Sequence, residues 1–141
     1  MNLNLKDKVM LVTGGGSGIG AAISLTLAGE GAVPVIIGKD PLDAAFEQAL
    51  RALQPQTRFF QGNLMEEEVC RSAVAATVEA FGHIDGLVNN AGVNDSVGLE
   101  AGREAFMASL DRNLIHCYVM ANLCLPHLKA SRGAIVIASA S

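Results

Sequence analysis

The residues with the clearest chemical potential form a glycine-rich run, TGGGSGIG, at residues 13–20. An apolar, strand-like segment leads into this run, and the step from Gly18 to Gly20 opens a segment of helical pattern. Glycines let the backbone turn tightly, and the free N–H groups and dipole at the start of a helix attract anions. The junction therefore predicts a site for the pyrophosphate of a dinucleotide, although an isolated glycine cluster can also build a turn that binds nothing.

A second polar cluster ends another apolar strand in two amides, an alanine and a glycine, at residues 89–92. On its own, this segment is typical of an ordinary turn, since Asn and Gly are common turn formers. Together with Thr13 and Ser17 in the first motif, it resembles the short-chain dehydrogenase/reductase family. The resemblance implies that residues 89–92 lie beside a dinucleotide and tie neighbouring strands together, and that Asp85 fills the family's acidic position before the strand.

The resemblance also implies a cofactor site at the ends of several strands. Gly38 stands where NAD-preferring relatives carry Asp, and Lys39 stands where NADP-preferring relatives often carry Arg, which favours NADP. Asp40 could still reach a ribose, so NAD stays open as the cofactor. Asn63 stands where the family usually has Asp beside the adenine. The expected cofactor-binding residues are Thr13, Gly14, Gly16, Ser17, Gly18, Ile19, Gly20, Gly38, Lys39, Asn63, Leu64, Asn90, Ala91 and Gly92.

The reaction that the resemblance implies is hydride transfer between a nicotinamide ring and a carbinol or carbonyl carbon. Asn113 matches the asparagine of the family's proton relay, although an exposed helix residue would look much the same. A gapless match puts the catalytic serine position on Ala140, and a shift of one residue brings Ser139 or Ser141 into the role. We therefore expect Asn113 and Ser139 to be the catalytic residues of this chain.

The family's catalytic tyrosine and lysine, spaced as YxxxK, have no counterpart before Ser141. Tyr118 is the only tyrosine, and the residue four positions further on is Asn122 instead of Lys. The sequence thus predicts an NAD(P)-dependent oxidoreductase whose chain, as given, is inactive without the YxxxK segment. The alternative is a dinucleotide-binding fragment without catalysis.

The substrate is indicated only by a general similarity of sequence outside the two motifs. Residues 92–100 and 113–116 are most similar to sugar dehydrogenases, in particular those that oxidise L-fucose and related aldoses. Asn94, Asp95 and Ser96 are candidates for hydrogen bonds to sugar hydroxyls, and equally for a polar loop that needs no ligand.

These candidate residues must be held by an α/β fold, and the pattern of apolar residues predicts one. Short apolar runs alternate with longer segments of helical period, as in a parallel sheet covered on both faces. We expect one Rossmann-type, doubly wound domain over residues 1–141, with strand order 3-2-1-4-5, truncated after the fifth strand. In the first helix, Ile19, Ile23 and Leu27 recur every four residues and are expected to face the sheet. The expected strands are 9–12, 35–37, 58–61, 86–88 and 134–138, and the expected helices are 17–30, 42–53, 66–81 and 101–129.

Composition excludes several functional classes. Half of the 141 residues are hydrophobic, which suffices for a buried core, and the net charge of −4 with scattered basic residues argues against a nucleic-acid surface. No segment is apolar for long enough to span a bilayer, and the amino terminus lacks the apolar core of a signal peptide, so the expected compartment is the cytoplasm. The spacing of Cys70, Cys117 and Cys124 indicates packing residues, with no metal site.

A sheet that stops at its fifth strand leaves that strand with unpaired backbone groups and an uncovered apolar flank. We therefore expect self-association into a homo-oligomer. In the resembling family the fourth helix packs between subunits, which assigns Tyr118, Met120 and Leu123 to the contact surface.

Overall fold

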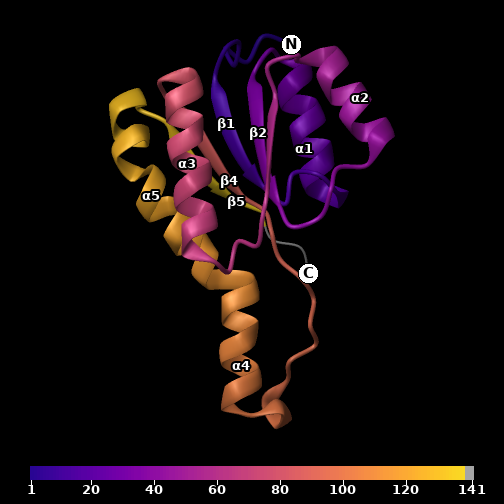
Figure 1. The fold of residues 1–141 in the computed structure, drawn as a ribbon, viewed down its shortest axis with the longest axis vertical. Coiled ribbons are helices and arrows are strands. Elements are labelled where there is room, and N and C mark those ends of the chain that lie inside the picture. Colours follow the sequence, from indigo (N-terminus) through magenta and orange to yellow (C-terminus); the bar gives the residue numbers. More distant parts are fainter. Residues whose placement is uncertain (139–141) are drawn as a thin grey trace.

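The structure is a computed structural model that describes residues 1–138, and it contains one five-stranded parallel sheet (Figure 1). The predicted strand order is confirmed, since the sheet runs β3-β2-β1-β4-β5. Leu11, in the central strand, pairs with Val35 on one side and with Leu87 on the other. The strands are β1 (Val9–Thr13), β2 (Val33–Gly38), β3 (Arg58–Gln61), β4 (Gly86–Asn89) and β5 (Ala134–Ile137).

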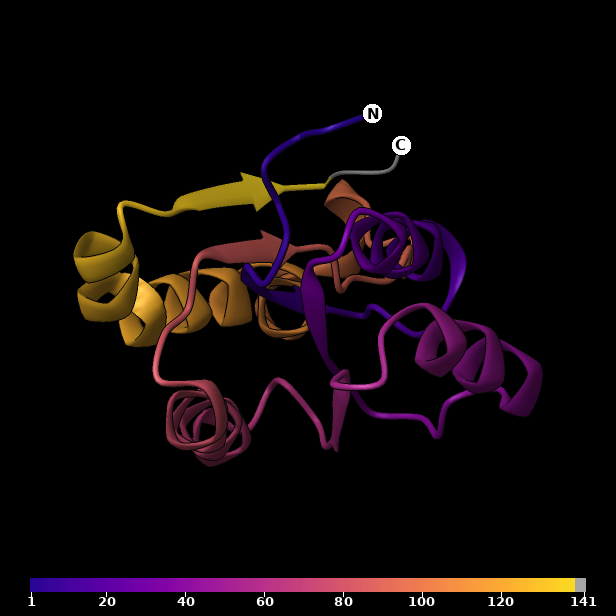
Figure 2. The ribbon, with the colours of Figure 1, turned by 90° about the horizontal axis from the view of Figure 1, so that it is seen from above.

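Helices cover the sheet on both faces, as Figures 1 and 2 show from two directions. Two helices, α1 (Gly18–Gly29) and α2 (Ala44–Leu53), pack together on one face, while α3 (Glu67–Phe81) and α5 (His116–Ser131) pack together on the other. This division follows from the strand order, because right-handed connections change face where the chain returns from β3 to β4. The same reversal opens a crevice at the carboxyl ends of β1 and β4.

The face of α1 that packs against the sheet is not the predicted one. Ile19, Ile23 and Leu27 do not face the sheet; the buried positions of the helix are Gly20, Ser24 and Ala28. Small side chains let α1 lie close to the strands, and the Ser24 hydroxyl donates to the Gly15 and Gly20 carbonyl oxygens at 2.9 Å each. The larger residues instead line a shallow apolar groove with the amino-terminal segment. The buried face of α1 is therefore the one whose small side chains allow the helix to lie close to the sheet, although it is not the most hydrophobic face.

The predicted helix over 101–129 is interrupted. A 3₁₀ turn (Leu99–Ala101) precedes α4 (Arg103–Leu110), and a π-helical turn (Asp111–Ile115) joins α4 to α5. A single π turn in a long helix inserts one extra residue and is frequently found at functional sites. This turn carries Asn113.

Two cysteines contribute to packing as expected. Cys70 and Cys124 are fully buried between the sheet and the helices α3 and α5. Burial raises the pKa of the Cys124 thiol to about 12 and also raises the pKa of the Cys70 and Cys117 thiols. Thiols with such pKa values hold almost no thiolate near neutral pH, which makes them poor nucleophiles.

This burial predicts the outcome of thiol labelling. At pH 8 in native buffer, iodoacetamide is expected to leave Cys70 and Cys124 unmodified, and in denaturant all three cysteines should react. Peptide mass spectrometry after timed quenching measures this. Rapid native modification of Cys124 would contradict the packing shown here.

The exposed surface agrees only in part with the contact residues expected for an oligomer. Tyr118 is 73% exposed, but Met120 is fully buried in the core and is therefore wrong as a contact residue. Helical geometry explains this, because Met120 lies two residues after Tyr118 and so on the opposite side of α5. The edge strand β5 is exposed along its whole length. Within residues 1–138, no helix has the length and apolarity needed to cross a membrane, and no cluster of His, Cys, Asp or Glu side chains is suited to a metal ion.

Candidate functional site

A cavity of about 530 Å³ opens at the carboxyl ends of the central strands, where the strand order reverses. The glycine-rich loop, the ends of β2 and β3, and the turn after β4 form its walls. Apolar side chains that the sequence analysis did not single out, Leu42 and Phe59 among them, complete the lining. Of the expected cofactor-binding residues, those that line the cavity are Gly14, Gly16, Ser17, Gly18, Ile19, Gly38, Lys39, Asn63, Leu64, Asn90, Ala91 and Gly92.

The glycine-rich loop has a backbone that side chains would distort. Gly14 and Gly18 have φ angles of +64° and +52°, in the left-handed region that L-residues rarely adopt. A Cβ on Gly20 would collide with the Gly14 carbonyl and with the Asn90 side chain, and one on Gly16 would come within 2.6 Å of a Leu42 methyl group. Glycine is therefore required by φ at Gly14 and Gly18 and by close approach to backbone at Gly20, whereas the Leu42 methyl group near Gly16 ends a flexible side chain that can move.

The loop presents the amino-terminal end of α1 to the cavity. Ser17 is the N-cap in an extended conformation, and its side chain makes no capping hydrogen bond. The first turn of α1 contains no acidic residue, so nothing in it opposes the binding of an anion. Backbone N–H groups and the helix dipole at this end favour a phosphate group.

Two residues behind the lining, Thr13 and Gly20, complete the expected set and hold its parts together. The Thr13 hydroxyl, which is fully buried, accepts hydrogen bonds from the backbone N–H groups of Asn90 and Ala91, both at 3.0 Å. The Asn90 side-chain amide donates to the Thr13 and Gly14 carbonyl oxygens at 3.2 and 3.1 Å. These four bonds join the ends of β1 and β4, so the two sequence motifs form one unit.

The ends of β2 and β3 form the opposite wall. The Gln61 side-chain amide donates to the Lys39 carbonyl oxygen at 3.2 Å and ties the two strand ends together. A Cβ on Gly38 would touch only a Phe59 ring carbon at 4.0 Å, which leaves room for a side chain there. Asn63 accepts the backbone N–H of Met65 through its side-chain oxygen at 2.9 Å, so its amide group remains as a donor.

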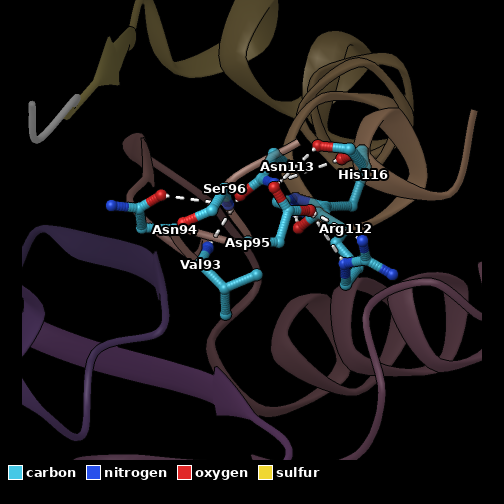
Figure 3. A network of polar contacts seen from close by, with 8 residues as sticks. Val93, Asn94, Asp95, Ser96, Arg112, Asn113 and His116 are labelled. Carbon is cyan, nitrogen blue, oxygen red and sulfur yellow. Dashed lines mark hydrogen bonds and ion pairs between the residues drawn. The ribbon is translucent and has the colours of Figure 1, made fainter. Parts of the chain in front are cut away.

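Asn113 lies in the π-helical turn and is not among the residues that line the cavity, although Val93, to which it is hydrogen-bonded, is (Figure 3). Its side-chain oxygen accepts the backbone N–H of Val93 at 2.7 Å, and its amide donates to the Ser109 carbonyl oxygen at 3.2 Å. The His116 Nε2 lies 2.8 Å from the Arg112 carbonyl oxygen. Because that oxygen can only accept, Nε2 carries the hydrogen.

Asp95 is held by the same turn. Its carboxylate accepts two hydrogen bonds from the Arg112 guanidinium, at 2.7 and 3.0 Å, and one from the Ser109 hydroxyl at 3.1 Å (Figure 3 shows the pair with Arg112). These bonds hold the pKa of the Asp95 carboxyl below its ordinary value of 3.8. The stabilisation they provide is therefore present above pH 3.8 and is lost as the pH falls further.

The polar contacts of the 93–97 loop bear on its two proposed roles. Arg112 and Ser109 occupy the Asp95 carboxylate, and the Asn94 side-chain oxygen accepts the Ser96 N–H at 3.2 Å. Both groups are used within the protein, which favours a loop held for structural reasons over one that offers these oxygens to a sugar.

Two further residues bear on catalysis. Ser139, with Ala140 and Ser141, lies outside the residues that the structure describes. Tyr118 is not among the lining residues of the cavity and points its side chain largely into solvent.

Comparison with known proteins identifies this arrangement. The family profile described as short chain dehydrogenase matches residues 8–141. The chain belongs to the short-chain dehydrogenase family. Its relatives in this family include the L-fucose dehydrogenase of Mus musculus, which is 39% identical over 132 residues, covering 92% of this chain and 47% of the relative. The "Probable galactose dehydrogenase GalD" of Rhizobium meliloti is 35% identical over 137 residues, covering 95% of this chain and 54% of that protein.

Solved structures of short-chain dehydrogenases share the fold. The crystal structure of Cj0485 dehydrogenase superimposes with a TM-score of 0.93 at 34% identity, covering 97% of this chain and 53% of the other. The NADH-dependent reductase A1-R′, crystallised in complex with NAD, gives a TM-score of 0.85 at 34% identity, covering 95% of this chain and 60% of the other. The chain spans about half the length of the curated relatives it matches.

The cavity of this short-chain dehydrogenase chain fits a dinucleotide. Gly16 and Gly20 lie close to Leu42 and Asn90 and carry no side chain, so the loop offers only backbone atoms where a pyrophosphate would lie. The apolar walls at Leu42 and Phe59 suit a flat ring such as an adenine. Among the described residues that line the cavity, the only Lys and Arg side chains are Lys39 and Arg112, and Asp95 neutralises the second of these.

Proposed function

We propose that the protein is an NAD(P)-dependent oxidoreductase that transfers a hydride between a nicotinamide cofactor and a sugar or another secondary alcohol or carbonyl substrate. One observation carries this proposal: the Thr13–Asn90 bonds place the phosphate-binding loop and the turn after β4 on one cavity that also reaches Val93 beside Asn113. A nicotinamide ring, when bound, supplies the hydride acceptor or donor. The residues of this chain bind the cofactor and orient it toward the substrate.

The proposed division of roles follows the geometry. The backbone N–H groups at Gly18, Ile19 and Gly20 bind the pyrophosphate, because they are the unsatisfied donors of the first turn of α1. Ala91 and Gly92 form the wall beside the nicotinamide end, and Asn113 belongs to the proton relay. Ser139 remains the proposed substrate-binding serine.

A sugar substrate is supported by the relatives named for L-fucose and galactose. We propose L-fucose or a related aldose as the first substrates to test. Because Asp95 and Asn94 are engaged within the protein, the sugar is expected to depend on other residues for its hydroxyl contacts.

NADP is the proposed cofactor, with NAD as the alternative. The end of β2 carries no carboxylate at Gly38, and the adjacent Lys39 supplies a positive charge suited to a 2′-phosphate. The reductase with a bound NAD shows that NAD suits a relative of similar fold.

Replacing Gly38 tests this preference. Gly38→Asp is expected to shift the ratio of NADP to NAD affinity by at least about tenfold toward NAD, since a carboxylate repels the 2′-phosphate and accepts hydrogen bonds from a free ribose. The side chain fits, because only Phe59 lies within 4.0 Å of the new Cβ. Gly38→Ala is the matched control and should leave the ratio unchanged. Isothermal titration with both cofactors measures it, and an equal response of the two variants would contradict the assignment.

The decisive experiment for the function uses the full-length protein. Thermal shift with NADP and NAD reports binding, since a ligand stabilises the fold that it binds by mass action. Absorbance at 340 nm after addition of L-fucose or D-galactose reports turnover. Cofactor binding with turnover supports the proposal, binding without turnover on any tested sugar supports a non-catalytic dinucleotide-binding protein, and absence of binding refutes both.

We also propose a homo-oligomer in the cytoplasm. Large apolar side chains are exposed along the α4–α5 surface. Light scattering is expected to give a mass above that of one protomer, and Tyr118→Glu is expected to lower it, because a buried unpaired charge opposes association. A monomer in the parent protein would contradict the oligomer. The exposed members of this surface are Phe106, Met107, Leu114, Ile115, Tyr118 and Leu125.

A further inference from the structure

One network joins two segments that are separate in sequence and meet beside Val93 and Arg112, which line the cavity (Figure 3). The first segment is the loop that follows β4, and the second is the π-helical turn with the end of α4. Three groups make the connection: the Asp95 carboxylate, the Arg112 guanidinium and the Ser109 hydroxyl. We call these three residues the Asp95 clamp.

The Asp95 clamp differs from the Arg–Glu pairs of the described chain. Arg51–Glu47 and Arg71–Glu67 each lie within one helix, between residues four apart, and their side chains are 42–63% exposed. In the clamp, Asp95 and Arg112 are 17 residues apart, and their side chains are 19% and 37% exposed. Both Arg112 donors reach the same Asp95 oxygen, Oδ2, and the Ser109 hydroxyl donates to Oδ1, so each oxygen of the carboxylate has a partner and its orientation is fixed.

The clamp lies next to the bond that holds Asn113. The Asn113 side-chain oxygen accepts the Val93 N–H, and Val93 is two residues before Asp95 on the same loop. Arg112 is the immediate neighbour of Asn113 in the turn. The loop and the turn are thus joined at Val93–Asn113 and at Asp95–Arg112, so a shift at the second contact is transmitted to the first.

The π-helical geometry makes such a second contact necessary. A π turn holds one residue more than an α turn and is less favourable, so surrounding contacts must maintain it. The side chains of Arg112 and His116 supply such contacts, the first to Asp95 and the second to the Arg112 carbonyl oxygen. Without them, the turn can relax and rotate Asn113 relative to the cavity.

We propose that the Asp95 clamp positions Asn113 for the proton relay by locking the 93–97 loop onto the π-helical turn. This inference rests on the proposed function, because it assigns the clamp a role in that reaction. The three clamp residues are positioning residues, since they act on the reacting groups through Asn113.

The test compares Asp95→Asn with a matched control in the full-length protein. Asp95→Asn keeps the side-chain shape and removes the charge, and Glu67→Gln makes the same change in the exposed pair on α3. Asp95→Asn is expected to lower kcat by about 10- to 100-fold, as small misplacements of reacting groups do, while the dinucleotide Kd changes by less than about twofold. Glu67→Gln is expected to change neither.

Hydrogen exchange gives a readout that does not need catalysis. In the absence of any ligand, Asp95→Asn should speed exchange of the Val93 amide at least about tenfold, because that N–H is protected by its bond to Asn113. The exchange of amides in β1 and β2 should stay the same. Ser109→Ala removes one bond of the clamp and serves as the milder variant if Asp95→Asn does not fold.

A double substitution separates positioning from general destabilisation. If the clamp acts through Asn113, adding Asp95→Asn to Asn113→Ala should lower kcat no further than Asn113→Ala alone. Multiplicative losses, or a lower melting temperature with unchanged kcat and unchanged Val93 exchange, would overturn the proposal. Should the parent protein bind cofactor without turnover, the proposed function fails, and Val93 exchange alone then decides whether the clamp holds Asn113.

Discussion

Gly20→Ala is expected to abolish dinucleotide binding. The added methyl group would collide with the Gly14 carbonyl and with the Asn90 amide, which lie where the loop folds back onto the first turn of α1. Neither can move alone, since the Asn90 amide also donates to the Thr13 and Gly14 carbonyl oxygens. Relief of the collision therefore requires the loop to open. We expect the cofactor Kd to rise by at least about 100-fold, equivalent to ~2.7 kcal/mol, and the free energy of unfolding to fall by about 1–3 kcal/mol from overpacking.

A control in the same helix distinguishes loop geometry from helix stability. Gly29 lies in the last turn of α1, and no atom lies within 4 Å of the position a Cβ would take. Gly29→Ala is expected to leave cofactor affinity unchanged and to stabilise the protein by roughly 0.5–1 kcal/mol, because alanine is the better helix former. Isothermal titration and chemical denaturation of both variants supply the comparison. Unimpaired cofactor binding by Gly20→Ala would refute the role assigned to the glycine-rich loop.

Thr13→Val is the substitution with the second largest expected effect. Valine keeps the shape of threonine but removes the oxygen that accepts the N–H groups of Asn90 and Ala91 at 3.0 Å. The threonine side chain is fully buried at the end of β1, and two donors lose their acceptor together. We expect the free energy of unfolding to fall by about 2–4 kcal/mol, since each buried group left without a partner costs ~1–3 kcal/mol.

The same substitution should also weaken cofactor binding, because it releases the turn that carries Ala91 and Gly92 on the cavity wall. Thr13→Ser retains the oxygen and is expected to recover most of the affinity and stability, with a residual loss of about 1 kcal/mol for the missing methyl group. Denaturant titration, followed by cofactor titration of the folded variants, checks both effects. Equal behaviour of the valine and serine variants would show that the hydroxyl does not hold the turn.

The fold was predictable because its signals are local and periodic. Apolar runs at β1, β2 and β4 predicted strands, and the helical period between them predicted a parallel sheet. The strand order followed from the right-handedness of connections, a property of all L-amino-acid chains. Residue bounds shifted by a few positions at most in the strands, as with β2, which begins at Val33 instead of residue 35.

The candidate site was predictable where a motif carries its own geometry. The glycine-rich loop and the Asn90–Gly92 turn bring eight expected residues to the lining of one cavity, and the ends of β2 and β3 bring four more. Leu42 and Phe59 were missed because an apolar residue near a strand end gives no signal that separates a cavity wall from the core.

Side-chain orientation and long-range polar partners were decided by the tertiary structure. The face of α1 was mispredicted because hydrophobicity alone does not encode how closely a helix approaches a sheet, and only small residues at Gly20, Ser24 and Ala28 permit the observed distance. Likewise, the sequence gives no sign that the Asp95 carboxylate has a partner within the protein, so it was a candidate for binding a substrate. In the folded chain Arg112 forms an ion pair with it.

The sequence by itself determined the sheet, its order and the glycine-rich loop, because strand period, connection handedness and glycine conformation act over a few neighbouring residues. Only the tertiary structure decided the π-helical turn, the clamp on Asn113 and the partner of the Thr13 hydroxyl. These depend on groups 14 to 78 residues apart, whose meeting is fixed by packing of the whole domain and by no local preference.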